Sequence, residues 1–190
     1  MKKKVSLIIV PYKRVDALRE TIESLEGEAY DELILVDNCP ESGTRAYAEP
    51  LAEANDKIKY FPLEENLGVA GGRNYGVNQA TGDILVFLDD DAVFKERGYF
   101  SKILDVFEKD EKIGALAFQI INFYTGEMQR KEIPFTDKTL DMEQERLTST
   151  FIGAGHAIRR EVFDKCGYFP DNFFYGGEEL DLSFRIIAAG

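Results

Sequence analysis

The sequence predicts an α/β protein with a Rossmann-like, doubly wound, mostly parallel sheet and flanking helices. Between residues 4 and 88, short apolar runs alternate with segments of helical periodicity, the pattern of successive βαβ units. The apolar runs are unbroken, as in strands buried on both faces of a parallel sheet. A length of 190 residues and a hydrophobic fraction of 44% suffice for one domain with a sizeable core.

Four strands are predicted by these apolar runs. They lie at residues 4–10, 32–36, 57–61 and 84–88. Three helices are predicted between the strands, because apolar residues recur there at helical spacing or follow a glycine-rich entry. They lie at residues 15–25, 44–54 and 69–80. This order favours right-handed crossovers between parallel neighbours.

The alternation changes after residue 91. A helix at 99–107, an extended strand at 113–122 and short helices at 159–166 and 178–189 are predicted. Residues 123–150 are polar and irregular, so they form either a substrate-facing loop or a variable surface excursion. The chain ends at Ala188-Ala189-Gly190 as if at a helix C-terminus. We therefore expect residues 1–190 to be a single domain, C-terminally truncated from a longer protein.

Composition excludes several classes of protein. The net charge of −12, from 23 basic and 35 acidic residues, argues against nucleic acid or anionic lipid as the main partner. Cys39 and Cys166 are too far apart for a zinc pattern and are expected to be free thiols. The apolar stretch 5–10 is stopped by Pro11 and is too short for a signal peptide or a membrane span. A cytoplasmic protein is expected, with membrane contact only through a C-terminal region outside this sequence.

Three consecutive carboxylates, Asp89, Asp90 and Asp91, follow the apolar run 84–88. Ligands of open α/β sheets bind beyond the carboxyl ends of such strands. Adjacent carboxylates repel one another, and a divalent cation with oxygen ligands relieves that repulsion. A turn or a helix cap explains one Asp in this position but not three. The sequence therefore favours a metal or diphosphate site.

Two further clusters follow the first two strands. Pro11, Tyr12 and Arg14 could line a nucleotide pocket, or they could form a turn that starts a helix. Asp37 could accept a hydrogen bond from a base or a ribose hydroxyl, or it could cap the helix that follows.

A glycine-rich segment runs from Asn66 to Asn74. Its glycines, including Gly71, allow close backbone approach, and Arg73 could pair with a diphosphate. The spacing matches neither G-x-G-x-x-G nor a P-loop. Tight packing at a helix start is the alternative.

Adjacent acids open the last predicted helix, at Glu178, Glu179 and Asp181. They suit the positive end of the helix dipole, and one of them could instead serve as a general base. His156 has no partner at metal-ligand spacing, so a core position is favoured over a role in metal or acceptor binding.

Together these clusters resemble the inverting glycosyltransferases of family two, which have the GT-A fold and include many enzymes of bacterial cell-surface polysaccharide synthesis. The resemblance covers nearly the whole chain in the same order. The matching stretches are residues 5–12, 32–38, 66–74, 82–91, 153–154 with 158–163, and 175–182.

The resemblance implies a role for each candidate. Asp37 corresponds to the acid that reads the base, and Arg73 to a base or diphosphate contact. Asp89 and Asp91 correspond to the ends of the D-x-D motif, with Asp89 near ribose and metal and Asp91 binding Mn²⁺ or Mg²⁺ directly. Glu179 corresponds to the catalytic base, with Glu178 as its rival. The remaining candidates for the nucleotide-sugar pocket are Pro11, Tyr12, Arg14, Asn66, Gly71 and Asp90.

The implied reaction is metal-dependent, inverting transfer of a hexosyl or deoxyhexosyl group. The donor would be a UDP or dTDP sugar, and the acceptor would be a hydroxyl of a glycan or a lipid-linked glycan. The family's further metal ligand, often a His, would lie beyond Gly190. Two alternatives stay open. One is a non-catalytic nucleotide-sugar-binding domain. The other is a phosphatase of the haloacid dehalogenase type, which Asp89-x-Asp91-x-Val93 fits but four preceding strands disfavour.

Overall fold

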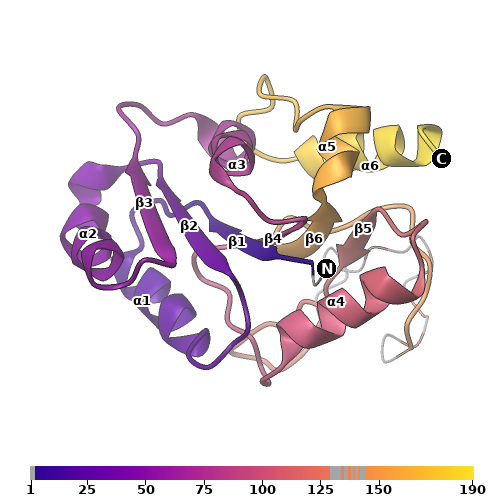
Figure 1. Cartoon of the computed structure of the whole chain (residues 1–190), viewed down its shortest axis with the longest axis horizontal. Coiled ribbons are helices and arrows are strands. Elements are labelled where there is room, and N and C mark those ends of the chain that lie inside the picture. Colours follow the sequence, from indigo (N-terminus) through magenta and orange to yellow (C-terminus); the bar gives the residue numbers. More distant parts are fainter. Residues whose placement is uncertain (1–2, 129–133, 135–136, 138, 140, 142–143) are drawn as a thin grey trace.

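The computed structural model describes residues 3–128, 134, 137, 139, 141 and 144–190. The strands are β1 (Val5–Ile9), β2 (Glu32–Asp37), β3 (Ile58–Pro62), β4 (Ile84–Leu88), β5 (Ala115–Ala117) and β6 (Gly155–Arg159). The helices are α1 (Val15–Ser24), α2 (Thr44–Ala54), α3 (Gly68–Gln79), α4 (Tyr99–Lys109), α5 (Arg160–Cys166) and α6 (Glu178–Ala188), with a 3₁₀ turn at Pro40–Ser42. The strands form one sheet in the order β3-β2-β1-β4-β6-β5, and helices cover both faces (Figure 1).

The four predicted parallel strands are confirmed. β1 pairs in parallel with both β2 and β4, and β2 pairs in parallel with β3. Every residue of β1, β2 and β4 is buried, as their unbroken apolar runs indicate. Their carboxyl ends therefore share one edge of the sheet, where polar residues of distant segments can meet.

One strand was not predicted. β6 lies between β4 and β5 and is antiparallel to both. The predicted strand at 113–122 is too long, because only three residues of β5 pair with β6. The segment of β6 lacks an apolar run, since His156 and Arg159 interrupt it.

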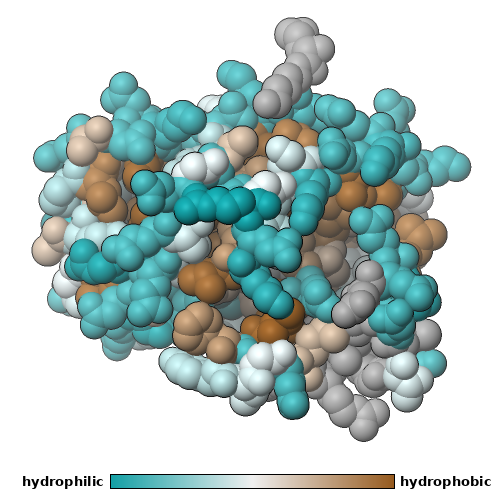
Figure 2. Space-filling model, turned by 90° about the horizontal axis from the view of Figure 1, so that it is seen from below, coloured by the Kyte–Doolittle hydropathy of each residue, from teal (hydrophilic) through white to brown (hydrophobic). Residues whose placement is uncertain are grey.

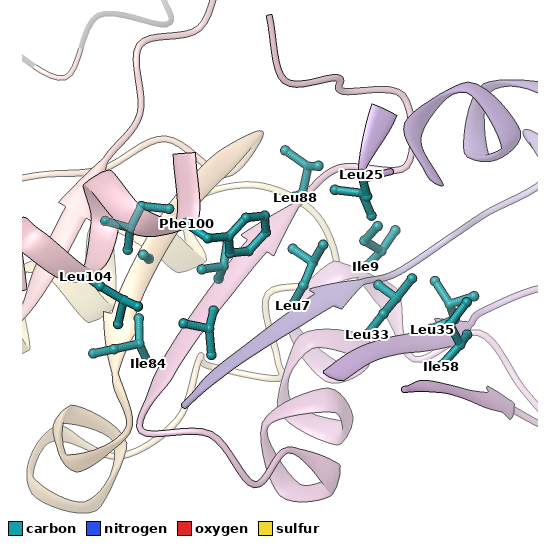
Figure 3. Packing of buried hydrophobic residues seen from close by; sticks show 14 of the residues in the cluster. Leu7, Ile9, Leu25, Leu33, Leu35, Ile58, Ile84, Leu88, Phe100 and Leu104 are labelled. Carbon is teal, nitrogen blue, oxygen red and sulfur yellow. The ribbon is translucent and has the colours of Figure 1, made fainter. Parts of the chain in front are cut away.

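Two hydrophobic clusters cover the two faces of the sheet. One cluster packs side chains of β1, β2 and β4 against α1, α2 and α4. The labelled side chains of these strands point to the same side of the sheet in Figure 3. The other cluster packs the opposite face against α3, α5 and α6. The helix that follows β4 and the one that precedes it thus lie on opposite faces, which leaves the strand ends open between them.

His156 is a core residue in the structure. Its ring is fully buried, 4.7 Å from the ring of Phe87 and 4.6 Å from that of Phe151 between centroids. Its Nδ1 lies 3.0 Å from the carbonyl oxygen of Ile152. Burial lowers the pKa of His156 well below its ordinary value, so the ring is neutral at physiological pH.

The outer surface is mostly hydrophilic. Figure 2 shows one face on which hydrophilic residues surround smaller hydrophobic areas. Among the described residues, no helix combines the length and the apolar character that crossing a membrane requires.

Candidate functional site

The carboxyl end of β4 and the beginning of β6 bring two loops together. Leu88 pairs with Gly155 across the antiparallel ladder, and the amide of Asp89 donates to the carbonyl oxygen of Ala154 at 3.1 Å. Gly153 therefore lies beside Asp89, although 64 residues separate the two in sequence (153 − 89). The antiparallel strand is what delivers this loop to the edge where the parallel strands end.

Arg73 occupies the centre of this edge. It projects from the first half of α3 and is only 5% exposed. Its Nη1 donates to Oε1 of Glu178 at 2.9 Å, and its Nη2 donates to the carbonyl oxygen of Gly153 at 2.8 Å and to Oδ1 of Asp89 at 3.3 Å. Arg73, predicted to contact the base or the diphosphate, thus has protein partners from three separate segments. It joins the end of β4, the start of β6 and the start of α6.

The two adjacent glutamates at the start of α6 differ in environment. Glu178 is 2% exposed and ion-paired with Arg73, while its Oε2 has no hydrogen-bond partner in the described part of the chain. Burial raises the pKa of Glu178, and the neighbouring Glu179 carboxylate adds to that rise, whereas Arg73 opposes it. Glu179 is only half-buried. Its Oε1 lies where a side chain at Gly153 would begin, so that glycine is what admits the carboxylate.

The glycine-rich start of α3 holds the segment that leads to these glutamates. The side chain of Asn74 exchanges two hydrogen bonds with the backbone of Phe169, at 2.8 and 3.0 Å. The amide of Val69 donates to the carbonyl oxygen of Phe174 at 3.0 Å. A β-carbon at Gly68, whose φ is +71°, would lie 2.5 Å from that same oxygen. This motif, predicted to approach a diphosphate, therefore contacts the protein's own chain.

Two further predicted residues of the motif have local roles. A β-carbon added to Gly71 would lie 2.7 Å from the β-carbon of Leu67, so the glycine permits the tight turn into α3. Asn66 is exposed and accepts a hydrogen bond from the amide of Gly68 at 2.9 Å. Only Asn66 of these two lines the cleft described below.

Asp90 and Asp91 share a second arginine. Arg14 forms ion pairs with both carboxylates. Asp90 is 2% exposed and also accepts a hydrogen bond from the amide of Tyr12 at 2.9 Å, so it ties the loop after β1 to the loop after β4. The side chain of Asp91 is 45% exposed. Of the three consecutive acids, Asp90 is therefore the structural one.

Desolvation is the main influence on Asp89 and Asp90. The surrounding protein raises the pKa of Asp89, and Asp91 adds to the rise, while Arg73 and Arg14 oppose it. Burial likewise raises the pKa of Asp90, against the opposing hydrogen bond from Tyr12 and the charge of Arg14. A bound cation favours the ionised form of a carboxylate, so it would lower these raised pKa values.

A divalent metal is the predicted ligand of the carboxylates at this edge. No group of three His, Cys, Asp or Glu side chains among the described residues is arranged as a metal cage. Mg²⁺ and similar ions are usually held by one or two carboxylates together with substrate phosphates and water. Asp89 and Asp91 match that pattern, since their side chains are 40% and 45% exposed and each pairs with a single arginine. Both residues therefore fit an ion that arrives with a diphosphate.

A cleft of about 480 Å³ opens beside this edge, over the ends of β1, β2 and β3. Ligand pockets are typically about 300–1,000 Å³, so the cleft has the volume of a small-molecule site. The cleft is lined by Tyr12, Lys13, Asn38, Cys39, Pro40, Glu41, Arg45, Pro62, Leu63, Glu64, Glu65 and Asn66. Of the predicted nucleotide-site residues, only Tyr12 and Asn66 are in this lining. Pro11 is buried behind it, where its carbonyl oxygen accepts from the amide of Asn38 at 3.1 Å.

Asp37 lies below the cleft rather than in its wall. It is fully buried, and its two oxygens accept hydrogen bonds from the amide of Cys39 at 2.8 Å and the hydroxyl of Tyr60 at 2.7 Å. Burial raises the pKa of Asp37 despite these donors. In this conformation Asp37 shapes the turn that carries Asn38 and Cys39.

Lys13, Arg45 and Gly153 are among the residues of the site that the sequence does not predict. Lys13 and Arg45 line the cleft, and Lys13 has a φ of +63°, the one positive φ outside glycine in the described part of the chain. Gly153 admits Glu179. Lys13 lies within a predicted cluster and could have been included, whereas nothing in the sequence connects Gly153 to Glu179.

Comparisons with known proteins agree on one family. The model of the family described as "Glycosyl transferase family 2" matches residues 6–167. A protein of Haemophilus influenzae described as uncharacterized is 40% identical over 175 residues, covering 89% of this chain and 94% of its own length. The uncharacterized glycosyltransferase YwdF of Bacillus subtilis is 33% identical over 176 residues, covering 87% of this chain. This chain spans 62% of the length of YwdF.

A solved structure supports the same fold. The mannosyltransferase PcManGT of Pyrobaculum calidifontis, in complex with GDP-Man and Mn²⁺, superposes with a TM-score of 0.76 at 20% identity. The match covers 98% of this chain and 52% of that one. The expected fold, a mostly parallel sheet with flanking helices, is confirmed by this likeness.

Proposed function

This chain belongs to glycosyltransferase family 2, and from that premise we propose that it transfers a hexosyl or deoxyhexosyl group from a nucleotide-diphosphate sugar to an acceptor hydroxyl with inversion. The observation that carries the proposal is the meeting of Asp89, Asp91 and Glu179 at one sheet edge, beside a cleft with the volume of a small-molecule site. Family membership removes the phosphatase alternative.

The donor would lie across the cleft and the end of β4. Its base and ribose would occupy the cleft between Tyr12 and Asn66, and its diphosphate would face Asp89 and Asp91. Because the diphosphate is anionic, the two carboxylates need a cation between them and the donor. Mn²⁺ or Mg²⁺ bound there would act as a Lewis acid on the departing diphosphate. UDP or dTDP is proposed as the nucleotide.

Glu179 is proposed as the general base. It is less buried than Glu178, and the ion pair with Arg73 occupies Glu178. The Glu179 carboxylate would take the proton from the acceptor hydroxyl while that oxygen forms a bond to the anomeric carbon. The bond from the anomeric carbon to the diphosphate oxygen breaks, and the nucleoside diphosphate leaves with the electron pair. A single in-line displacement inverts the anomeric centre.

Arg73 would be a positioning residue in this reaction. Its guanidinium holds Glu178, Gly153 and Asp89 at fixed distances from one another. The base and the donor site would thereby keep a constant separation, which is the contribution of orientation to catalysis. A role in cell-surface polysaccharide synthesis, with a glycan or lipid-linked acceptor, extends this proposal.

Asp91→Asn tests the donor site. The exposed carboxylate contributes little to folding, so we expect unchanged thermal stability. The variant lacks one carboxylate that would bind the metal ion. Its affinity for UDP in the presence of Mn²⁺ should therefore fall about 30-fold or more, measured by titration calorimetry. Asp105→Asn, the same change at an exposed position of α4, serves as the control. Equal affinity in Asp91→Asn and the control would contradict the proposed donor site.

A non-catalytic nucleotide-sugar-binding domain is the second candidate. This chain spans 62% of the length of YwdF, and residues needed for transfer could lie in the part of YwdF that it does not match. Release of free nucleoside diphosphate on addition of an acceptor distinguishes transfer from binding alone.

A further inference from the structure

Three consecutive aromatic side chains lie exposed immediately before the paired glutamates. Phe173 is 39% exposed, Phe174 59% and Tyr175 85%. Two glycines in left-handed conformation, Gly176 and Gly177, separate them from Glu178. Exposed aromatic clusters of this kind on a folded protein mark binding surfaces more often than chance positions do.

The segment that carries these aromatics is fixed to the catalytic edge at several points. Asn74 holds the backbone of Phe169, and Val69 holds the carbonyl of Phe174. Arg73 holds Glu178 at the end of the segment. All three anchoring residues belong to α3, beside which the segment passes in Figure 1. The backbone that carries the aromatic side chains is therefore held in place relative to the glutamates.

The anchors also limit how far the segment could move. The amide of Phe173 donates to the carbonyl of Pro170 at 3.0 Å, which closes a turn before the aromatics. A β-carbon on Gly177 would lie 3.6 Å from the ring of Phe173, so this ring packs back against the start of α6. Phe174 and Tyr175 are left as the outward surface. A ligand that binds them pays little for ordering the loop.

We propose that Phe174 and Tyr175, supported by Phe173, form an acceptor subsite that stacks on the apolar face of a neutral saccharide. A pyranose presents a face of C–H groups, which packs on a flat aromatic ring, and the Tyr175 hydroxyl can hydrogen-bond a sugar hydroxyl. The subsite rests on the proposed transferase function, because it lies four residues before the proposed base, Glu179 (179 − 175).

Local charge argues for a neutral occupant. Residues 168–190 contain four acids and one base, and Arg73 is ion-paired with one of these acids, so the net charge around the segment is −2 (2 − 4). The acids are Asp171, Glu178, Glu179 and Asp181, and the base is Arg185. An anionic lipid headgroup or a phosphorylated acceptor would be repelled here. A neutral sugar ring has no such penalty.

Saturation-transfer difference NMR without nucleotide tests the subsite directly. The probes are the methyl β-glycosides of glucose, galactose and N-acetylglucosamine, each added to wild-type protein. We expect saturation transfer to the ring C–H protons of at least one glycoside. Tyr175→Ala should weaken that binding about fivefold, and Tyr175→Phe should keep most of it, because stacking rather than the hydroxyl supplies the larger share.

Tyr47→Ala is the control. Tyr47 lies in α2, which packs on the face of the sheet opposite α3 and α6, so its removal should leave glycoside binding unchanged. Absence of saturation transfer from wild-type protein to all three glycosides, or equal transfer from Tyr175→Ala, would overturn the subsite. Phosphatidylcholine vesicles provide the other decisive arm. If wild-type protein sediments with these vesicles while Tyr175→Ala does not, that result overturns the subsite and assigns the aromatic side chains to a membrane surface instead.

The test separates this subsite from the proposed function. Glycoside binding without UDP binding would keep the subsite and contradict the donor site. UDP binding without glycoside binding would do the reverse.

Discussion

The two edges of the sheet treat buried carboxylates in opposite ways. At the amino-terminal edge, Glu32 is 6% exposed and receives hydrogen bonds from Ser6, from both the amide and the hydroxyl of Thr81, and from Lys59. At the carboxyl-terminal edge, Glu178 has one ion pair and one oxygen without a partner among the described residues. Both carboxylates are almost completely buried, but only Glu32 has hydrogen-bond partners for both of its oxygens.

The pKa values of the carboxylates at the two edges shift in opposite directions. Burial alone would raise the pKa of Glu32, yet the four hydrogen bonds that its carboxylate accepts lower it to about 2. At the other edge, burial raises the pKa of Glu178, Asp89 and Asp90 against the arginines nearby. Glu32 therefore stabilises the fold, whereas the carboxylates of the opposite edge are destabilised in a way that a bound cation or ligand can relieve.

The largest effect expected from this contrast is on transfer. Glu179→Gln should lower the turnover number about 1,000-fold, because general acid–base catalysis typically contributes about 10²–10⁴. Binding of UDP and the melting temperature should not change. Steady-state release of nucleoside diphosphate with acceptor, compared with calorimetry, checks both. Glu108→Gln on α4 is the control, and full activity in Glu179→Gln would move the base to Glu178.

Gly153→Ala should have the next largest effect. The added methyl group would overlap Oε1 of Glu179 and lie 3.2 Å from Nη2 of Arg73. We expect turnover to fall about 100-fold, because misplacing a catalytic group by about 1 Å costs that much. Gly114→Ala adds a methyl group 3.2 Å from Val162, away from the carboxylates, and should retain turnover. Equal losses in the two variants would show a general packing defect instead.

Glu32→Gln tests the carboxylate at the amino-terminal edge of the sheet. Loss of the charge should lower the free energy of unfolding by about 2 kcal/mol at pH 7 and leave UDP binding intact. The folded-state pKa of about 2 lies below the ordinary value of 4.5. The contribution of Glu32 is therefore complete above pH 4.5 and is lost as pH falls toward 2. Urea titrations of wild type and variant should converge over that range, and a constant difference would contradict the assignment.

Lys59→Met should have the smallest effect. Its ammonium pairs with Glu32, but 39% of the Lys59 side chain is exposed, so solvent weakens the pair. We expect a loss of about 1 kcal/mol in unfolding free energy and no change in turnover. Lys57→Met, at the same end of β3, is the control. A loss as large as that of Glu32→Gln would mean that Lys59 alone satisfies the carboxylate.

Strands whose burial is set by the local sequence pattern can be predicted from the sequence. The unbroken runs of β1, β2 and β4 predict buried parallel strands, and the structure confirms them. β6 is equally buried but depends on distant partners. Arg159 in β6 donates to the carbonyl oxygens of Phe107 and Ile113, and no short window of sequence contains those partners.

The same limit applies to the candidate site. The sequence selects segments that the fold brings together, since Asp89, Glu178 and Arg73 meet at one edge. It does not foresee that Arg73 is buried between protein carboxylates, because residues 73 and 178 are paired across 105 positions. A residue type reveals what it can bind, but burial decides whether a ligand can reach it.

The antiparallel strand β6 affects how the surroundings of the site can change in evolution. β5 runs parallel to β4, so Ala117 ends at the edge where Asp89 begins its loop, and Gly155 starts β6 at that same edge. The described ends of the excursion between them, residues 118–128 and 144–154, therefore leave and re-enter the sheet beside the carboxylates. Changes of length or sequence in this excursion alter the surroundings of the site while the strand pairing stays the same. Relatives could diversify what they recognise there at little cost to the scaffold.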